Sequence, residues 1–389
     1  MGRIAILNGD ILTWPGGLQR GGVLIESGVI VAVGPQVAEA IPPDAQVINA
    51  ADKIIAPGYI DIHVHGGAGY DTMDATPEAL SAMAAFFAAH GVTSFLPTTV
   101  TASREDTLAA IRAVAEFQRQ PPQGAQALGI HLEGPYINTS YRGAQNPQFV
   151  RSPDAEEYRA FFAAGNVKLI SLAPEHPASA DLISYAVAQG ATVAVGHSAA
   201  TYEQVLAAVS LGLTQATHTY NAMVGLHHRE PGAVGAALTC DRIYAQIIVD
   251  LVHVHPAAVK LLLRAKGPER TVLITDAIRA AGMPDEIYEL GGQQIIVTKG
   301  EARLPAGNLA GSTLTMDRAV RSVMQATGCS LVDAIRMATL TPAESIGLAD
   351  RKGRLAPGWD ADIILLDKDL NVALTMVQGQ IAPARDRLQ

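Results

Sequence analysis

Two histidines separated by one residue, His63 and His65, lie in a run of residues typical of a β-strand. Ile60, Ile62 and Val64 alternate with polar residues there. Since successive side chains of a strand point to opposite faces, both imidazoles point the same way. Neutral imidazole is the commonest protein metal ligand, so the pair predicts part of a metal site. For an isolated His-x-His motif, the alternative is a half-buried strand with two hydrogen-bonded histidines.

Three more residues of ligand type, Glu133, His197 and His218, each end or directly follow a short apolar run. Together they predict three ligands with an open position for water, which is the arrangement of a catalytic ion. Glu133 can also bridge to a second ion held by His63 and His65, and such a pair of ions activates a water. Taken singly, each residue could instead be a paired buried carboxylate or a satisfied core histidine.

Asp276 follows the apolar run Val272–Ile274 and is the candidate general acid and base. A carboxylate beside the water can accept its proton and return it to a departing amine. A helix N-cap or a further metal ligand is the alternative role. His131 precedes Glu133 by two residues on the same face, and we expect it to support the ligands rather than bind the ion.

Two basic residues lie outside this set. Arg229, in the segment His-His-Arg-Glu-Pro-Gly, offers a fork of donors that suits an oxyanion, and a salt bridge to Glu230 is its alternative role. His253 is a candidate substrate contact or a helix cap.

The elements that position these residues show one repeating pattern, in which a short apolar run is followed by an alanine-rich helical run. Eight such units predict an α/β fold with a (β/α)8 TIM-like barrel, whose active site lies where the strands end. The predicted strands end at His65, Thr98, Glu133, Ala173, His197, His218, Asp250 and Asp276. The predicted helices are Pro77–His90, Arg104–Gln120, Pro153–Ala164, Ala178–Gln189, Tyr202–Leu211, Pro256–Arg264, Thr315–Thr327 and Leu331–Thr339.

Short β-rich runs flank this region at both ends of the chain. The first separator between them is Asn8–Asp10, which we interpret as a turn. We expect residues 1–56 and 352–389 to form one small discontinuous β-sandwich domain and residues 57–351 to form the barrel. An insertion at about 277–309 contains a hairpin turn at Gly291–Gly292 and is expected to fold over the barrel mouth.

Composition excludes several classes of protein. The net charge is -9 over 389 residues without a basic stripe, which argues against nucleic-acid binding. The two cysteines, Cys240 and Cys329, have no paired spacing, so a thiolate zinc cluster is excluded and a reducing compartment is indicated. No run approaches the ~20 apolar residues of a membrane span, and the N-terminus lacks a signal-peptide pattern. We therefore expect a cytoplasmic protein without a membrane partner.

Together these motifs resemble the amidohydrolase superfamily and, within it, the N-acetylglucosamine-6-phosphate deacetylases. The resemblance covers nearly the whole chain. Its motifs are Pro-Gly-x-Ile-Asp-x-His-x-His-Gly-Gly from Pro57, His-Leu-Glu-Gly-Pro at Glu133, Gly-His at His197, Thr-His-x-Tyr-Asn-Ala-Met from Thr217, Arg-Glu-Pro-Gly from Arg229, Thr-Asp-Ala at Asp276 and Leu-Ala-Gly-Ser from Leu309. It implies metal-dependent removal of an acetyl group from a phosphorylated amino sugar, in amino-sugar catabolism or cell-wall recycling.

The resemblance also implies roles for single residues. Glu133, His197 and His218 hold the principal metal, His63 and His65 support a second ion, and Asp276 is the acid and base and a further ligand. The substrate contacts are Ala144, Gln145, Asn221, Ala222, Arg229, His253, Leu309, Ala310 and Gly311. The cofactor is one or two divalent ions, with zinc expected and iron, manganese or cobalt as alternatives. A homodimer is implied, in which Arg229 reaches the neighbouring subunit's site.

Two positions depart from the family's pattern. Gln145 stands where some members carry histidine, and Leu251 stands where the family has glycine. These changes keep open a deacetylase of N-acetylgalactosamine 6-phosphate or of another N-acylated amino sugar. A more remote alternative is a metal-bearing binding module without catalysis. Cyclic-amide hydrolases fit the Arg229 motif and Glu133 poorly.

Overall fold

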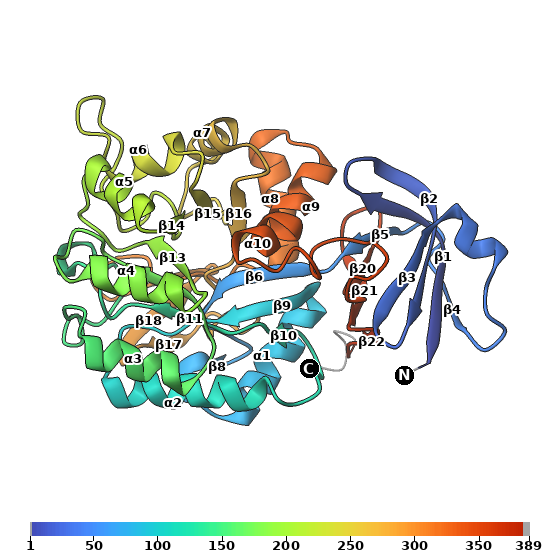
Figure 1. Cartoon of the computed structure of the whole chain (residues 1–389), viewed down its shortest axis with the longest axis horizontal. Coiled ribbons are helices and arrows are strands. Elements are labelled where there is room, and N and C mark those ends of the chain that lie inside the picture. Colours follow the sequence, from blue (N-terminus) through green and yellow to red (C-terminus); the bar gives the residue numbers. More distant parts are fainter. Residues whose placement is uncertain (1, 384–389) are drawn as a thin grey trace.

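Parallel strands form the interior of the larger part of the fold. In the computed structural model, which describes residues 2–383, they lie in two sheets whose ends adjoin (Figure 1). One sheet has the order β10-β9-β6, and the other runs from β11 to β16 in sequence order. A bridge between Thr98 and His131 links them on one side, and the Asp276 N–H donates to the His63 carbonyl on the other. The strands are β6 (Tyr59–Val64), β9 (Val92–Pro97), β10 (Gln126–Ala127), β11 (Ile130–Glu133), β12 (Val167–Leu172), β13 (Thr192–Val195), β14 (Leu213–Ala216), β15 (Tyr244–Ile248) and β16 (Thr271–Ile274).

Helices follow most of these strands and cover the outside of the parallel sheets (Figure 1). All eight predicted helices are found, with ends that differ by at most three residues. The sequence pattern does not predict α6, because this glycine-containing helix is buried on nearly every side and so shows no polar face. Within the described residues, no helix has the length and apolar character to cross a membrane. The helices are α1 (Pro77–Ala89), α2 (Arg104–Phe117), α3 (Ala155–Ala164), α4 (Ser179–Ala188), α5 (Tyr202–Ser210), α6 (Gly232–Thr239), α7 (Pro256–Lys266), α8 (Met316–Thr327), α9 (Leu331–Ala338) and α10 (Leu340–Ser345), with 3-10 turns η1 (Pro35–Glu39), η2 (Thr72–Asp74) and η3 (Thr139–Tyr141).

Side-chain caps explain where several helices begin. Thr76, Ser103, Asp154 and Thr201 each accept a hydrogen bond from the backbone N–H three residues ahead, at the starts of α1, α2, α3 and α5. Such caps satisfy N–H groups that have no partner inside the helix. The boundaries between strand-end loops and helices are therefore encoded locally, and the loops that carry the site have defined ends.

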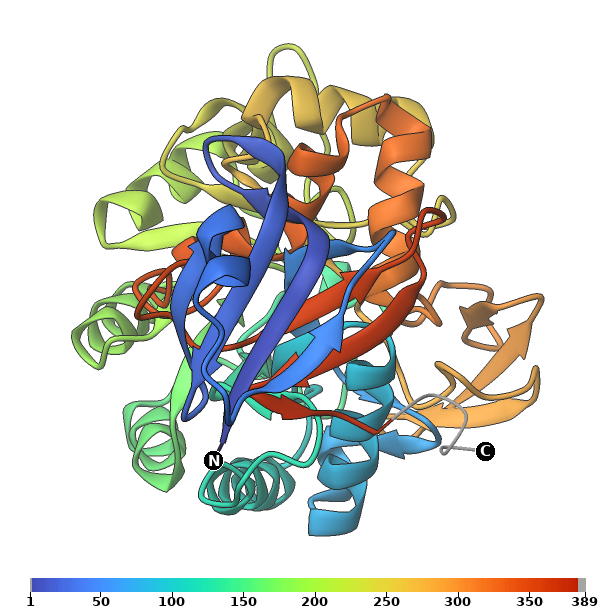
Figure 2. The same cartoon turned by 90° about the vertical axis from the view of Figure 1, so that its right-hand side faces the viewer.

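Both ends of the chain build one mixed sheet with the order β22-β21-β20-β5-β1-β2-β3, and β4 also pairs with β1. Figure 2 shows the strands of the two chain ends side by side. The interpretation of Asn8–Asp10 as a turn is wrong. β1 continues through it, and Asn8 (φ 65°) sits in a β-bulge where the pairing with β2 shifts register. The strands are β1 (Arg3–Thr13), β2 (Gly17–Glu26), β3 (Val29–Gly34), β4 (Gln46–Asn49), β5 (Ile54–Pro57), β20 (Ile363–Leu366), β21 (Val372–Val377) and β22 (Gln380–Ile381).

The predicted hairpin of the insertion is confirmed. β17 (Ile287–Leu290) and β18 (Gln293–Thr298) are joined by Gly291 and Gly292, both at positive φ, and β19 (Glu301–Arg303) completes a small antiparallel sheet. Glycine suits this turn because the left-handed region costs it little. Leu290 and Ala310 belong to a separate apolar cluster under this sheet. A further two-residue pair, β7 (Gly66–Gly67) and β8 (Tyr70–Asp71), follows β6.

A buried lysine joins the mixed sheet to the parallel strands. The Lys352 ammonium is almost fully buried and donates to Gln126 Oε1 at 2.8 Å and to Asp362 Oδ2 at 2.6 Å. Asp360 Oδ2 lies 2.9 Å away. A buried cation requires such partners, so the three acceptors fix how β10 meets the segment that precedes β20.

A second buried ion pair joins α1 to α8. Asp317, in the first turn of α8, accepts from His90 Nδ1 at 3.0 Å and from Arg321 at 2.9 Å. Burial alone would raise the pKa of Asp317, but the hydrogen bond and charge of His90, with help from Thr315 and Arg321, hold it well below its usual range. The pair thereby joins the C-terminal end of α1 to the first turn of α8.

Replacing Asp317 with asparagine should lower the free energy of unfolding by about 1–3 kcal/mol at neutral pH. A depressed native pKa adds stability that is fully present above the ordinary carboxyl pKa and is lost as pH falls through the lower native pKa. The difference in unfolding free energy between wild type and variant should therefore shrink steadily from about pH 5 down to about pH 2. Urea unfolding across this range measures it, with exposed Asp350→Asn as the control. An equal gap at every pH would contradict the ion-pair explanation.

Candidate active site

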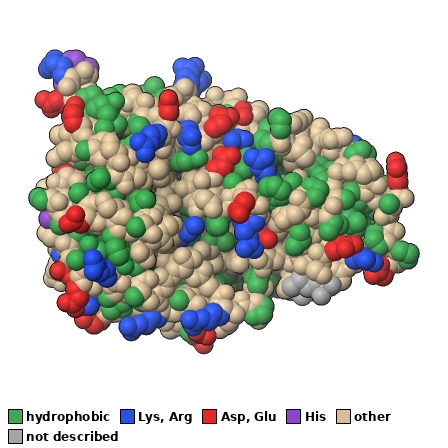
Figure 3. Space-filling model, in the orientation of Figure 1, with side chains coloured by type: hydrophobic (Ala, Val, Ile, Leu, Met, Phe, Trp, Pro, Cys, Tyr) green, Lys and Arg blue, Asp and Glu red, His purple; other side chains and the backbone are tan. Residues whose placement is uncertain are grey.

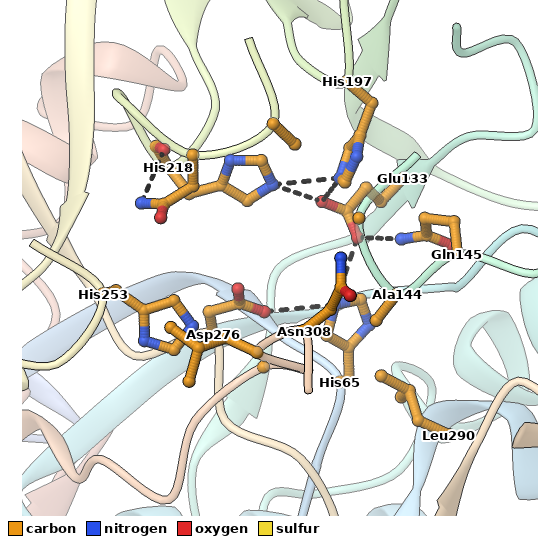
Figure 4. A pocket seen from close by; sticks show the side chains of 15 residues that line it. His65, Glu133, Ala144, Gln145, His197, His218, His253, Asp276, Leu290 and Asn308 are labelled. Atoms are coloured by element: carbon orange, nitrogen blue, oxygen red, sulfur yellow. Dashed lines mark hydrogen bonds and ion pairs between the residues drawn. The ribbon is translucent and has the colours of Figure 1, made fainter. Parts of the chain in front are cut away.

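Four histidines and one glutamate converge where the parallel strands end. Figure 4 labels His65, Glu133, His197 and His218 of this cluster. Glu133 Oε1 lies 3.1 Å from Nε2 of both His197 and His218, and 3.4 Å from His63 Nε2. The other oxygen, Oε2, lies 3.2 Å from His65 Nε2. Ligand atoms within 4.8 Å of one another form two groups, His63–His65–Glu133 and Glu133–His197–His218. Glu133 is therefore shared, with one oxygen directed mainly to each group.

The outer nitrogens of three imidazoles face oxygen acceptors. His63 Nδ1 lies 3.3 Å from Gln246 Oε1, His65 Nδ1 lies 3.2 Å from the Thr98 carbonyl, and His197 Nδ1 lies 2.9 Å from the Tyr141 carbonyl. A carbonyl accepts only, so each Nδ1 carries the proton and each Nε2 presents a lone pair to the centre. Such partners fix both the tautomer and the ring orientation of metal-binding histidines.

Three site residues have an unusual backbone conformation. His197, His218 and Asp276 have φ values of 49°, 28° and 50°, in the left-handed region that residues other than glycine seldom adopt. Each lies two residues beyond the end of its strand, where the sharp change of direction aims the side chain across the mouth of the sheet. Strain of this kind is typical of functional sites held by surrounding structure.

Asp276 faces the His63–His65 side of the cluster. Its Oδ1 lies 3.2 Å from His65 Nε2 and 3.5 Å from His63 Nε2. Its N–H donates to the His63 carbonyl at 2.9 Å, and its own carbonyl accepts from the Ser312 N–H at 2.8 Å. Hydrogen bonds to His63 and Ser312 therefore hold the backbone of Asp276 on both sides, and its carboxylate lies beside the ligand groups.

The ionisable groups of the cluster shift one another's pKa values. Burial alone would raise the pKa of Glu133, but the surrounding histidines, led by His63 and His197, hold it well below its usual range. Burial likewise opposes the ionisation of Asp276, yet His63 and His65 lower its pKa. Burial would lower the pKa of His65, whereas hydrogen bonds to Asp276 and Glu133 raise it. Both carboxylates are therefore ionised at neutral pH.

His131 stands behind the cluster. Its Nε2 lies 2.7 Å from Ser171 Oγ, and its ring packs edge-on against His63 at 4.6 Å between centroids. Burial and the nearby His63 lower its pKa well below the usual value. His131 belongs to neither ligand group, which agrees with the expectation that it supports the ligands.

The donor set fits a divalent metal. His63 Nε2 is buried without a hydrogen-bond partner in the described chain, although it points at two carboxylates. Nitrogen and carboxylate ligands from four histidines and Glu133 suit zinc, iron, manganese or cobalt. A cation at this position would satisfy the lone pairs that the imidazoles direct inward.

Most of the predicted site residues line one pocket of roughly 160 Å³ over this cluster. Its wall includes predicted residues from the loops after β11, β14, β15 and β16. These predicted residues are His65, Glu133, Ala144, Gln145, His197, His218, Asn221, Ala222, His253, Asp276, Leu309 and Gly311. Gly143, Leu290 and Asn308 also line the pocket, and sequence motifs did not single them out. Leu290 shows that the hairpin of the insertion reaches the pocket.

Three predicted residues do not line the pocket. His63 lies beneath it as a potential ligand, and Ala310 is fully buried with its N–H donating to the Ala302 carbonyl. Arg229 lies on an exposed loop that projects from the surface after β14 (Figures 1 and 3). Its guanidinium contacts His228 Nε2 at 2.7 Å, and no ion pair with Glu230 occurs in the described residues.

His253 reaches the pocket on a strained loop. Its Nδ1 lies 2.7 Å from Asp250 Oδ2. Burial opposes the charged form of His253, but the bond to Asp250 raises its pKa above the usual value. Leu251 has φ 65°, so the leucine is held in a conformation that glycine would adopt freely. The side chain of Leu251 packs against the main apolar core.

Glu175 is a supporting residue that the sequence motifs missed. Its carboxylate accepts from Asn138, from the Ser198 hydroxyl at 2.7 Å and from the Ala199 N–H at 2.7 Å. It therefore joins the loops after β11, β12 and β13 next to His197. A lone glutamate after an apolar strand carries no sequence signal that separates this role from surface charge.

Three comparisons place the chain among known proteins. The model of the amidohydrolase family matches residues 54–382. N-acetylgalactosamine-6-phosphate deacetylase of Escherichia coli O157:H7 is 42% identical over 374 residues, covering 96% of this chain and 97% of that protein. N-acetylglucosamine-6-phosphate deacetylase of Lysinibacillus sphaericus is 41% identical over 336 residues, covering 86% and 87%. The structure of an aspartate-to-alanine variant of the Mycobacterium smegmatis N-acetylglucosamine-6-phosphate deacetylase, in complex with N-acetylglucosamine 6-phosphate, has 36% identity and a TM-score of 0.91, covering 98% of this chain and 99% of that one.

Proposed function

This chain belongs to the amidohydrolase family, and we propose that it hydrolyses the acetamide of N-acetylglucosamine 6-phosphate to glucosamine 6-phosphate and acetate. The observation that carries the reaction type is that two ligand groups share Glu133 in the same pocket as Asp276. The proposed substrate is supported by the names of relatives that align over most of this chain and by the similar structure solved in complex with N-acetylglucosamine 6-phosphate.

Glu133, His197 and His218 would hold the principal ion, and His63 and His65 would support a second. A divalent ion at this position supplies Lewis-acid charge to the acetyl carbonyl and lowers the pKa of a water that it binds. Zinc is the expected ion for these ligands. The inward Nε2 atoms of His197 and His218 and Oε1 of Glu133 lie close enough together to bind one ion.

Asp276 is the group that moves the proton. Its lowered pKa keeps it ionised, so it can accept a proton from the attacking water. As the new carbon–oxygen bond forms and the carbon–nitrogen bond breaks, the same carboxyl returns the proton to the departing amine. Asp276 Oδ1 lies 3.2 Å from His65 Nε2, so the carboxylate is next to the proposed second-ion ligands.

His253 and the backbone around Asn221, Ala222, Leu309 and Gly311 are the proposed sugar contacts, because these residues line the wall of the pocket. His253, whose pKa is raised by its bond to Asp250, is suited to hydrogen bonding with a polar or anionic group of the substrate.

Arg229 is proposed to bind the sugar phosphate of a neighbouring subunit in a homodimer. In its own chain the guanidinium is exposed and does not line the pocket. A guanidinium binds phosphate by paired hydrogen bonds, and an exposed loop can present it to a second subunit.

Replacing Arg229 with alanine should lower kcat/KM for the phosphorylated sugar by about 10- to 100-fold, since a charge-assisted contact contributes roughly 1.5–3 kcal/mol. Mixing and refolding this variant with Asp276→Asn subunits should restore activity, because a trans arrangement leaves one site of the mixed dimer intact. Exposed Arg264→Ala serves as the matched control. Mixed dimers that stay inactive would exclude the trans role.

The parallel strands are proposed to close as a (β/α)8 barrel over residues 57–351. The hydrogen bond from Asp276 to His63 supports this closure. Residues 1–56 and 352–389 are proposed as the small β-sandwich domain, of which residues 1 and 384–389 lie outside the described structure. Pairing of β5 with β20 supports this union of the two chain ends.

N-acetylgalactosamine 6-phosphate is the second candidate substrate, because a relative named for it is 42% identical over 96% of this chain. Acetate release should be measured from both phosphorylated sugars and their unphosphorylated forms, before and after chelation and metal return. We expect turnover of phosphorylated N-acetylglucosamine that chelation removes. No acetate release from either sugar would favour the remote alternative of a binding module. Faster acetate release from N-acetylgalactosamine 6-phosphate would make that sugar the preferred substrate.

A further inference from the structure

Gln145 makes two short hydrogen bonds that use both ends of its amide. Figure 4 shows the one to Glu133. Oε1 accepts from the Thr101 N–H at 2.6 Å, and Nε2 donates to Glu133 Oε2 at 2.6 Å. Because the Thr101 N–H can only donate, the amide oxygen must face it and the NH2 group must face the carboxylate. The orientation of the amide is therefore fixed by its partners.

The loop that carries Gln145 is itself anchored. Arg151 donates to the Ala102 and Phe149 carbonyls and pairs with Glu157 at 2.9 Å. The Ala144 carbonyl accepts from Gln293 of β18 at 2.5 Å. Gln145 is only 7% exposed. A rigid loop thus holds the amide against Glu133.

The bond reaches only one of the two oxygens of Glu133. Oε1 faces His197 and His218, whereas Oε2 faces His65 and receives the Gln145 N–H. Rotation of the carboxylate would break this bond. Gln145 therefore keeps Oε2 directed to the His63–His65 group, where the second ion is proposed.

We propose that Gln145 is a positioning residue for Glu133, and that its hydrogen bond to Oε2 sets the affinity of the His63–His65 side for a second divalent ion. This inference rests on the metal centre of the proposed function. Hydrogen-bond partners of ligating groups typically contribute about 10- to 100-fold to metal affinity. One N–H of the amide remains, so a contact between Gln145 and substrate stays a separate prediction.

Zinc titration of the chelator-treated protein, by calorimetry and by metal analysis after dialysis, tests the proposal without measuring turnover. Gln145→Met should weaken the second zinc equivalent by about 10- to 100-fold and change the first much less. Gln145→His should restore much of the second affinity, because neutral imidazole offers one donor and one acceptor. Gln148→Met, on the same loop but exposed, is the matched control.

Wild-type affinity for both ions in Gln145→Met, or equal weakening of both, would overturn the proposal. Thermal melting of each variant separates a folding defect from a local effect. Recovery of the second zinc affinity in Gln145→His would show that the hydrogen bond to Glu133, and not the packing of the side chain, is responsible. If the protein binds zinc as expected but releases no acetate, the proposed function fails while the role of Gln145 stands. If zinc does not bind to wild type at all, both fail.

Discussion

Asp276→Asn should lower kcat by about 10²- to 10⁴-fold while the protein keeps its principal metal. Asparagine has nearly the same shape, and the backbone bonds to His63 and Ser312 do not involve the side chain. The amide, however, has no proton-accepting carboxylate for the attacking water. The effect should fall on kcat more than on KM, because the lost interaction belongs to the transition state.

Metal analysis of the same Asp276→Asn protein supplies the internal control. The principal ion should stay at wild-type occupancy, since Glu133, His197 and His218 are untouched. Partial loss of a second ion would add a ligand role for Asp276. Full activity of the variant would end its assignment as acid and base.

Glu133→Gln should remove most of both ions and lower kcat/KM by about 10³-fold or more. Glu133 is the one residue common to both ligand groups in the described chain, and its low pKa makes it the main negative charge among four imidazoles. A metal is worth several kcal/mol of transition-state stabilisation, and each ~1.4 kcal/mol is tenfold in rate.

Elemental analysis and acetate release measure this outcome together, and Glu156→Gln on the exposed face of α3 is the matched control. Excess zinc should recover little activity, because the shared ligand itself is missing. A Glu133→Gln protein that retains two ions and full turnover would contradict the shared-ligand arrangement.

Sequence periodicity was sufficient for the main elements of the site. His63 and His65 alternate with apolar residues, so their common face could be predicted without long-range information. Glu133, His197, His218 and Asp276 were predicted because polar residues after buried parallel strands meet at one edge. Family membership, the helices and the hairpin at Gly291–Gly292 are confirmed.

The supporting contacts could not be predicted in this way. Gln246, Thr101 and Glu175 act through partners far away in the chain, and a single glutamine, threonine or glutamate has many other common roles. Arg229 was placed at a phosphate by resemblance, and the single chain leaves it outside the pocket. The alternation of apolar and polar residues along a strand determines which face of the sheet a side chain points to. Its hydrogen-bond partners, in contrast, depend on how distant loops pack together.

The sheet built from both chain ends has a consequence for biosynthesis. β5 pairs with β20 from Ile54↔Leu366 to Pro57↔Ile363, so one edge of β5 has no partner until the chain up to Leu366, about 300 residues later, has left the ribosome. Closing so long a loop is slow, and an unpaired strand edge is prone to aggregation. We therefore expect completion of this sheet after translation, and chains truncated before Ile363 should depend on chaperones or precipitate.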